Sequence, residues 1–109
     1  MDDFERPTPN SARAKRAYST GPNKLIEVVE RAVEGLPRWT LESSRDGELH
    51  AIRRTRLFRF RDDVTVRIVE QANGSEARFE SASRVGKVDL GRSPRNLEEL
   101  LDAINRELG

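Results

Sequence analysis

The sequence contains no cysteine, so it has no disulfide, no thiolate nucleophile and no cysteine ligand for a metal. Its single histidine, His50, has no nucleophile at a motif position beside it, which excludes hydrolysis by a catalytic triad. No apolar run approaches the length of a membrane span or of the core of a signal peptide. Taken by itself, the chain is expected to be cytoplasmic.

An excess of charge of one sign is also missing. The 20 basic and 19 acidic side chains leave a net charge of +1, which disfavours a dedicated nucleic-acid or membrane-surface protein. A chain of 109 residues is one domain by length. We expect that domain to span residues 22–109, after a flexible N-terminal arm, residues 1–21, in which only Phe4 and Tyr18 are large apolar residues.

Two helices are predicted, one at each end of the domain. Apolar residues recur at three- and four-residue spacing over residues 22–36, which is typical of an amphipathic helix. The same spacing over residues 94–108 predicts a second helix. Ser93 is a good N-cap for it, and Pro94 suits its first helical position.

Alternating apolar and polar residues predict four strands between these helices. Two dipeptides typical of two-residue hairpin turns, Asp46-Gly47 and Asn73-Gly74, divide them. The order helix, four strands, helix contains no βαβ unit. The prediction is therefore an α+β fold, a four-stranded antiparallel meander with the N- and C-terminal helices packed on one face, in the order α-β-β-β-β-α.

The hydrophobic pattern also predicts the register of the middle strands. A loop at residues 61–63 keeps Phe60 opposite Val64 and leaves one face apolar. A turn at Asn73-Gly74 would then place Ile68 opposite Phe79. The opposite charges that this register would pair are Arg67 with Glu80 and Asp63 with Arg84.

Two runs of the sequence resemble the signatures of domain-of-unknown-function family 1499. Residues 57–63 read Leu-Phe-Arg-Phe-Arg-Asp-Asp, similar to Leu-Phe-x-Phe-x-Asp-Asp, and residues 81–91 match Ser-x-Ser-Arg-x-Gly-x-x-Asp-x-Gly. The resemblance covers roughly residues 25–108 and implies no particular activity. The chain departs from the family at Arg92, where asparagine is frequent, and at Glu80, where arginine is frequent. Members often carry an N-terminal membrane or lipoprotein segment.

The loop of residues 84–95 is the most specific candidate site. Two glycines can expose backbone amides, and four basic side chains lie beside the start of a helix, where an anion is favoured. The candidate ligand-binding residues are Arg84, Gly86, Lys87, Asp89, Gly91, Arg92, Ser93 and Arg95. We expect a small anion or an acidic peptide as the partner. The alternative is that Arg84 and Asp89 pair with neighbours and hold the loop in place.

Asp62 and Asp63 carry the competing hypothesis, a metal-assisted enzyme, because carboxylates are ligands for hard cations. Adjacent aspartates are also common turn residues. Ser81 and Ser83 fall on the inward side of a strand, where small residues let a helix approach. Nothing matches a P-loop, a dinucleotide fingerprint or a zinc site, so no cofactor is expected.

The sequence thus favours a non-enzymatic binding module over a metal-assisted enzyme. A purely structural or protein-interaction domain remains a further alternative. Nucleic-acid binding through the arginines of the central strands is disfavoured, because acidic residues alternate with them and few aromatic residues are exposed.

Overall fold

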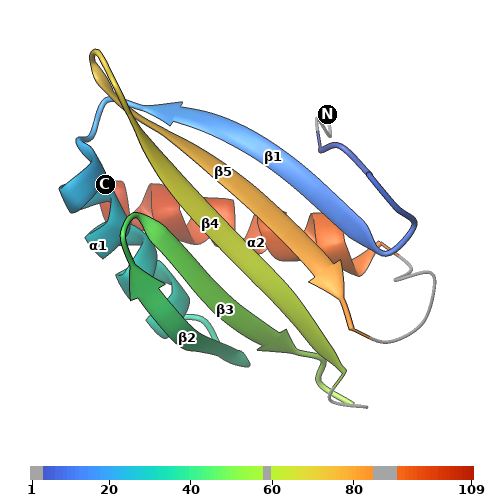
Figure 1. Cartoon of the computed structure of the whole chain (residues 1–109). Coiled ribbons are helices and arrows are strands. Elements are labelled where there is room, and N and C mark those ends of the chain that lie inside the picture. The colour runs from blue at the N-terminus through green and yellow to red at the C-terminus, as the bar shows by residue number, and fades with distance from the viewer. Residues whose placement is uncertain (1–3, 58–59, 85–90) are drawn as a thin grey trace.

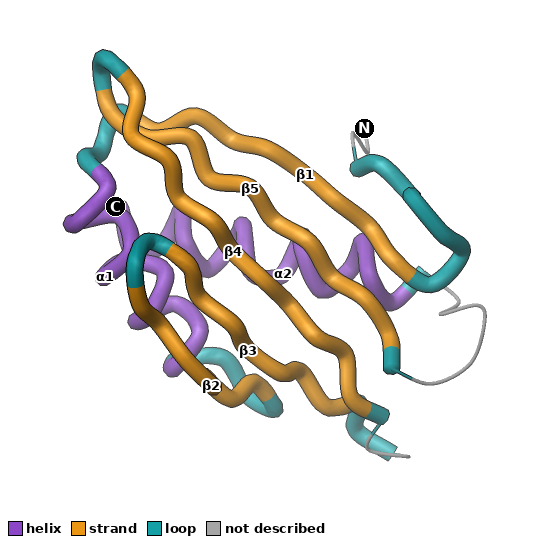
Figure 2. The backbone as a smooth tube through the Cα atoms, viewed as in Figure 1, coloured by secondary structure: helices purple, strands orange, loops and turns teal. Residues whose placement is uncertain are grey.

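The computed structural model describes residues 4–57, 60–84 and 91–109. In chain order its elements are β1 (Ser11–Tyr18), α1 (Pro22–Glu34), β2 (Trp39–Arg45), β3 (Glu48–Arg54), β4 (Arg61–Gln71), β5 (Gly74–Ser83) and α2 (Arg92–Leu108). The strands form one antiparallel sheet in the order β1-β5-β4-β3-β2. Both helices lie behind the same face of this sheet, as predicted (Figures 1 and 2).

The hydrophobic core lies between that face and the helices. Inward-facing side chains of the sheet, such as Leu49, Val66 and Phe79, are buried against the apolar faces of α1 and α2. Leu25 of α1 and Leu100 of α2 are fully buried there. Within the described part of the chain, both helices fall short of the length and apolar character that crossing a bilayer requires.

The sequence predicted the first helix and the first hairpin correctly. α1 begins at Pro22 and ends before Gly35. Arg45 pairs with Glu48, so Asp46 and Gly47 form the two-residue turn, both at positive φ (54° and 76°). α2 begins two residues earlier than predicted: Gly91 (φ 85°) is its N-cap, and Ser93 lies inside the helix.

The predicted number of strands was wrong, because the structure has five strands and not four. The additional strand, β1, falls within the segment expected to be an arm and pairs with β5 along its whole length. Its core-facing residues include Ala12 and Ala14, both buried. Alanine adds little apolar surface, so the alternation of this strand left only a weak signal in the sequence.

The predicted register of the β4–β5 hairpin was wrong by two residues. Gln71 pairs with Gly74, and Ile68 therefore pairs with Ala77 instead of Phe79. A shift by two residues keeps every side chain on its face of the sheet, because the period of a strand is two. The hydrophobic pattern cannot distinguish these two registers.

The turn lies one residue earlier than the Asn73-Gly74 pair suggested, and Gly74 is the first residue of β5. A Cβ atom at this position (φ 146°) would lie 2.1 Å from the backbone oxygen of Tyr18. The glycine is therefore required for the close approach of the end of β1, and not for the turn itself.

The connection between β3 and β4 also differs from the prediction. It spans residues 55–60 instead of 61–63, and Val64 pairs with Ala51 instead of Phe60. The base of this loop is closed by Thr55, whose amide donates to the Phe60 carbonyl at 2.9 Å and whose hydroxyl accepts from the Phe60 amide at 2.8 Å. Asp62 and Asp63 are consequently residues of the strand β4 and not of a loop.

Candidate functional site

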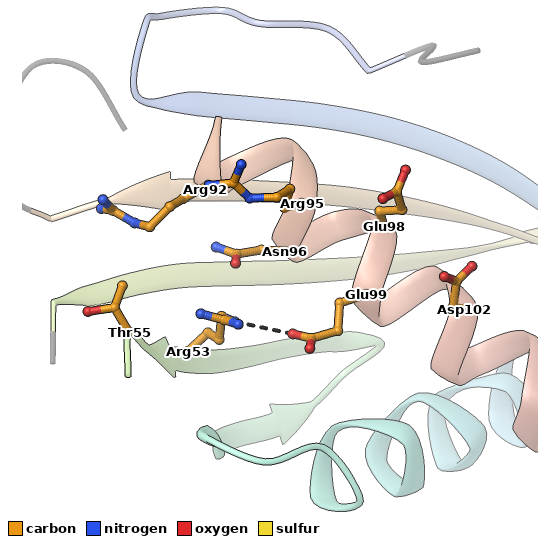
Figure 3. Close-up of a pocket in the computed structure, with 8 residues that line it drawn as sticks. All are labelled: Arg53, Thr55, Arg92, Arg95, Asn96, Glu98, Glu99 and Asp102. Carbon is orange, nitrogen blue, oxygen red and sulfur yellow. Dashed lines mark hydrogen bonds and ion pairs between the residues drawn. The ribbon is translucent and has the colours of Figure 1, made fainter. Parts of the chain in front are cut away.

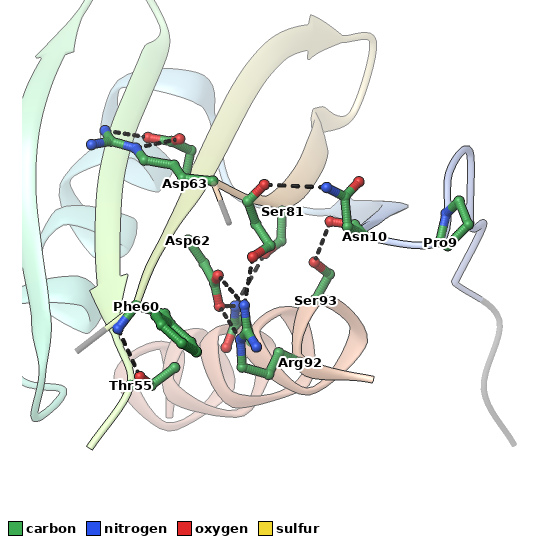
Figure 4. Close-up of polar contacts among 12 residues, drawn as sticks. Pro9, Asn10, Thr55, Phe60, Asp62, Asp63, Ser81, Arg92 and Ser93 are labelled. Carbon is green, nitrogen blue, oxygen red and sulfur yellow. Dashed lines mark hydrogen bonds and ion pairs between the residues drawn. The ribbon is translucent and has the colours of Figure 1, made fainter. Parts of the chain in front are cut away.

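Asp62 lies inside the protein. It shares the inward side of β4 with Val64 and Val66, and none of its surface is exposed. A buried carboxylate requires a cation and hydrogen-bond donors. Arg92, at the start of α2, donates to it through Nε (3.2 Å) and Nη2 (3.1 Å), and the Asn96 amide donates at 2.8 Å. The charge of Asp62 is thus balanced beneath α2 (Figure 4).

Ser81 and Ser83 face inward as predicted and belong to the same cluster. The Asn96 amide donates to the Ser81 hydroxyl at 3.2 Å, and Arg92 donates to the Ser83 hydroxyl. The Arg92 guanidinium also lies 5.7 Å from the centre of the Phe60 ring. Residues of both sequence signatures therefore meet at the first two turns of α2.

Asp63 points to the opposite face of the sheet. Arg84 donates two hydrogen bonds to its carboxylate, from Nε at 2.8 Å and from Nη2 at 2.7 Å, and His50 Nε2 lies 2.9 Å from Oδ1. The bonds from Arg84 lower the pKa of Asp63 most, partial burial opposes them, and His50 lowers this pKa further. The predicted proximity of Asp63 and Arg84, on the face away from the helices, is confirmed.

The two adjacent aspartates therefore do not form one pair of cation ligands. Asp62 is held by Arg92 inside the protein, whereas Asp63 is held by Arg84 and His50 outside. Among the described residues, no group of three histidine, aspartate or glutamate side chains could hold a metal ion.

The predicted ligand-binding loop is only partly covered by the structure. Gly86, Lys87 and Asp89 lie outside the described residues. Of the remaining arginines, Arg84 is bound to Asp63 on the outer face of the sheet, whereas Arg92 and Arg95 belong to α2 on the inner face. The structure thus separates Arg84 from Arg92 and Arg95.

The members that remain together form the start of α2. Gly91 caps the helix, and the Ser93 hydroxyl donates to the carbonyl of Asn10 at 3.2 Å. The Asn10 amide in turn donates to the carbonyl of Ser83 at 3.3 Å. The segment before β1 therefore fastens the beginning of α2 to the end of β5.

A cleft of about 520 Å³ lies between this first half of α2 and the end of β3 (Figure 3). We call it the α2 cleft. Its lining is charged and polar, and consists of Arg53, Thr55, Arg92, Arg95, Asn96, Glu98, Glu99 and Asp102. Figure 3 shows Arg92 and Arg95 near the beginning of α2 and Asp102 farther along the helix. Arg92 and Arg95 thus lie toward one end of the α2 cleft and Asp102 toward the other, whereas Arg53 pairs with Glu99.

Glu99, one of the carboxylates that line the α2 cleft, is held by two hydrogen bonds. It accepts a hydrogen bond of 2.6 Å from the indole Nε1 of Trp39 and one of 3.2 Å from Nε of Arg53. These contacts fix the carboxylate beside β2 and β3. Arg53 is thereby oriented along the wall of the α2 cleft.

Sequence reasoning missed Arg53 and Asn96. One available signal was the alternation of side chains along β4. Asp62 lies two residues before Val64, so both side chains point to the inner face of the sheet. Asn96 precedes Leu97 on the buried side of α2 and could have been assigned to the same layer. The contacts of Asn10 lie more than 70 positions away in the chain, so its role could not be deduced from neighbouring residues.

Comparison with known protein families gives one match. The model of a family described as "Protein of unknown function (DUF1499)" covers residues 3–104. No curated protein sequence matches the chain.

Solved structures share the fold at low sequence identity. Protein MLL2253 of Mesorhizobium loti is 12% identical, with a TM-score of 0.67 over 90% of this chain and 96% of its own. A Rhodobacter sphaeroides protein is 10% identical, with a TM-score of 0.59 over 97% of this chain and 93% of its own. CV1439 of Chromobacterium violaceum is 12% identical, with a TM-score of 0.52 over 92% and 95%. At these identities, the similarity establishes the architecture alone.

Proposed function

The chain belongs to the DUF1499 family, whose function is unknown, and we propose that it is a non-catalytic module that binds a small anion in the α2 cleft. The observation that carries this proposal is the convergence of Arg53, Arg92 and Arg95 on the cleft beside the amino end of α2. Guanidinium groups present paired donors that match a carboxylate or a phosphate group.

The start of α2 adds to the positive electrostatic potential of these arginines. The first amides of a helix have no intrahelical partner, and the helix dipole favours negative charge there. The cleft supplies a concave surface at that point, which a helix end on a flat surface would lack. A carboxylate or a phosphate ester is therefore the class of ligand that this end of the α2 cleft favours.

The arginines of the α2 cleft have different roles. Arg92 balances the charge of buried Asp62, so its main role is to position the start of α2. Arg53 is oriented by Glu99, and Arg95 is exposed at the entrance. Glu98 and Asp102, farther along α2, repel an anion and confine it to the arginine end.

Calorimetric titration with inorganic phosphate, acetate and a short acidic peptide tests the proposal. Arg95→Gln should weaken phosphate binding by about tenfold, since a hydrogen bond to a charged group contributes about 1.5 kcal/mol or more. Arg78→Gln is the matched control, because it removes the same charge from the outer face of β5, where Arg78 pairs with Glu76. Its affinity should equal that of the wild type.

Equal affinity of the wild type and the Arg95→Gln variant, or absence of binding at millimolar ligand, would contradict the proposal. The chain would then be better described as a structural or protein-interaction domain. The cytoplasmic location expected from the sequence remains part of the proposal.

A further inference from the structure

The connection between β3 and β4 exposes an apolar residue among arginines. Leu57 is 79% exposed, the most of any large apolar residue described. Arg56 beside it is exposed, and Arg54 and Arg61 stand at the base of the loop. We call Arg54, Arg56, Leu57 and Arg61 the β3–β4 tip. Figure 1 shows the described part of this connection at the end of the sheet opposite the β4–β5 turn.

The arginines of the tip have no carboxylate partner among the described residues. In the part of the chain that the structure describes, none of Arg54, Arg56 and Arg61 forms an ion pair; Arg54 donates to the Thr40 hydroxyl at 3.1 Å. The nearest carboxylates along the chain, Asp62 and Asp63, are already held by Arg92 and Arg84. The tip is therefore a local concentration of positive charge on a chain whose net charge is only +1.

Arg54 and Arg61 also face each other directly across β3 and β4. Like charges at directly opposite positions destabilise a hairpin. Elsewhere in the sheet Arg67 faces Arg78 in the same way, but these two have carboxylate partners, Glu48 and Glu76. The unrelieved pair at the tip is the arrangement that an external anionic surface would neutralise.

We propose that the β3–β4 tip docks on a membrane surface of anionic phospholipid, with Leu57 inserted between the headgroups and the arginines on the lipid phosphates. At a bilayer interface, an apolar side chain buried among the headgroups and basic side chains near anionic lipids both contribute to binding. Binding of a single-stranded nucleic acid depends on exposed aromatic rings for stacking, whereas the exposed large apolar side chain among the described residues of this loop is leucine.

The closed base of the loop supports insertion of the tip. The two hydrogen bonds between Thr55 and Phe60 hold the ends of the loop together, and the Phe60 ring lies against Arg92. Leu57 is thereby held outside the sheet in the free protein. The base of the tip is thus fixed before docking, which lowers the entropic cost of binding.

Vesicle sedimentation tests this inference. Wild-type protein should bind vesicles of phosphatidylcholine with about 30% phosphatidylserine, and bind pure phosphatidylcholine vesicles far more weakly. Arg56→Gln and Arg61→Gln should each lower the partition coefficient by about fivefold. Leu57→Ser should lower it by at least about fivefold while keeping the charge.

Arg106→Gln is the matched control, because it removes the same charge from the exposed last turn of α2, at the other end of that helix from Arg92. It should change binding by less than about twofold. Leu57→Trp should show a blue-shifted emission on the anionic vesicles, which reports insertion and not mere adsorption.

Three results would overturn the inference: an Arg106→Gln effect as large as that of Arg56→Gln, binding that ignores Leu57→Ser, or tighter binding to a thymidine oligonucleotide than to anionic vesicles. The inference does not depend on the proposed function. Arg56, Leu57 and Arg61 do not line the α2 cleft, so either proposal can fail alone.

Discussion

Asp62 and Asp63 are consecutive residues of β4 whose carboxylates lie on opposite faces of the sheet. Asp62 is fully buried and binds Arg92 of α2, whereas the side chain of Asp63 is 32% exposed and binds Arg84. Asp62 thus holds the start of α2 against the inner face of the sheet. Asp63 holds Arg84, the residue after β5, on the outer face.

The two aspartates should differ sharply in their effect on stability. Asp62→Asn leaves Arg92, itself only 17% exposed, without its counter-charge and should lower the free energy of unfolding by about 3 kcal/mol. Asp63→Asn weakens a contact near solvent and should cost less than about 1 kcal/mol. Urea denaturation of the two variants measures both values. Equal losses would contradict the assignment of the two faces.

The pKa of Asp63 should depend on Arg84. Because the folded-state pKa lies below the unfolded value, Asp63 contributes stability above that unfolded value, about 3.9, and the contribution is lost as the pH falls through the folded pKa. Arg84→Gln removes the largest cause of the shift and should raise the pKa of Asp63 towards its ordinary value. Carboxyl ¹³C titration by NMR measures this change. Arg67→Gln, whose partner is Glu48, should leave it unaltered.

Gly74→Ala tests the place of β1 in the sheet. The added methyl group would meet the backbone oxygen of Tyr18 at 2.1 Å, and φ at this position is positive (146°). The variant should lose about 2 kcal/mol or more of stability. Gly21→Ala is the comparison, because no atom lies within 4 Å of the added methyl group; it should cost no more than about 1 kcal/mol. A harmless Gly74→Ala would mean that β1 does not approach the turn this closely.

Local chemistry explains which parts of the fold could be predicted. The periodicity of α1 and the Asp46-Gly47 turn depend on neighbouring residues alone, and both were predicted correctly. The register of β4 against β5 places Gly74 against the end of β1, which is a contact between distant segments. It could not be deduced from the pattern of either strand.

The candidate site shows the same division. The sequence indicated that arginines gather near the start of α2 and that Asp63 lies near Arg84. It did not indicate that Asp62 would be buried, because two adjacent aspartates suggested a turn. Arg53 joined the site only through the pairing of β3 with β4, which the predicted loop at residues 61–63 had misplaced.

The most direct test of the central claim, that the α2 cleft binds an anion, is an NMR titration of the ¹⁵N-labelled protein with inorganic phosphate. The account predicts amide shifts concentrated at Arg53, Thr55 and the first two turns of α2, with the last turn of α2 and the outer face around Arg78 unchanged. Arg95→Gln should reduce these shifts at equal phosphate concentration. Unmoved amides around the α2 cleft at millimolar phosphate, or shifts centred on another face, would contradict it.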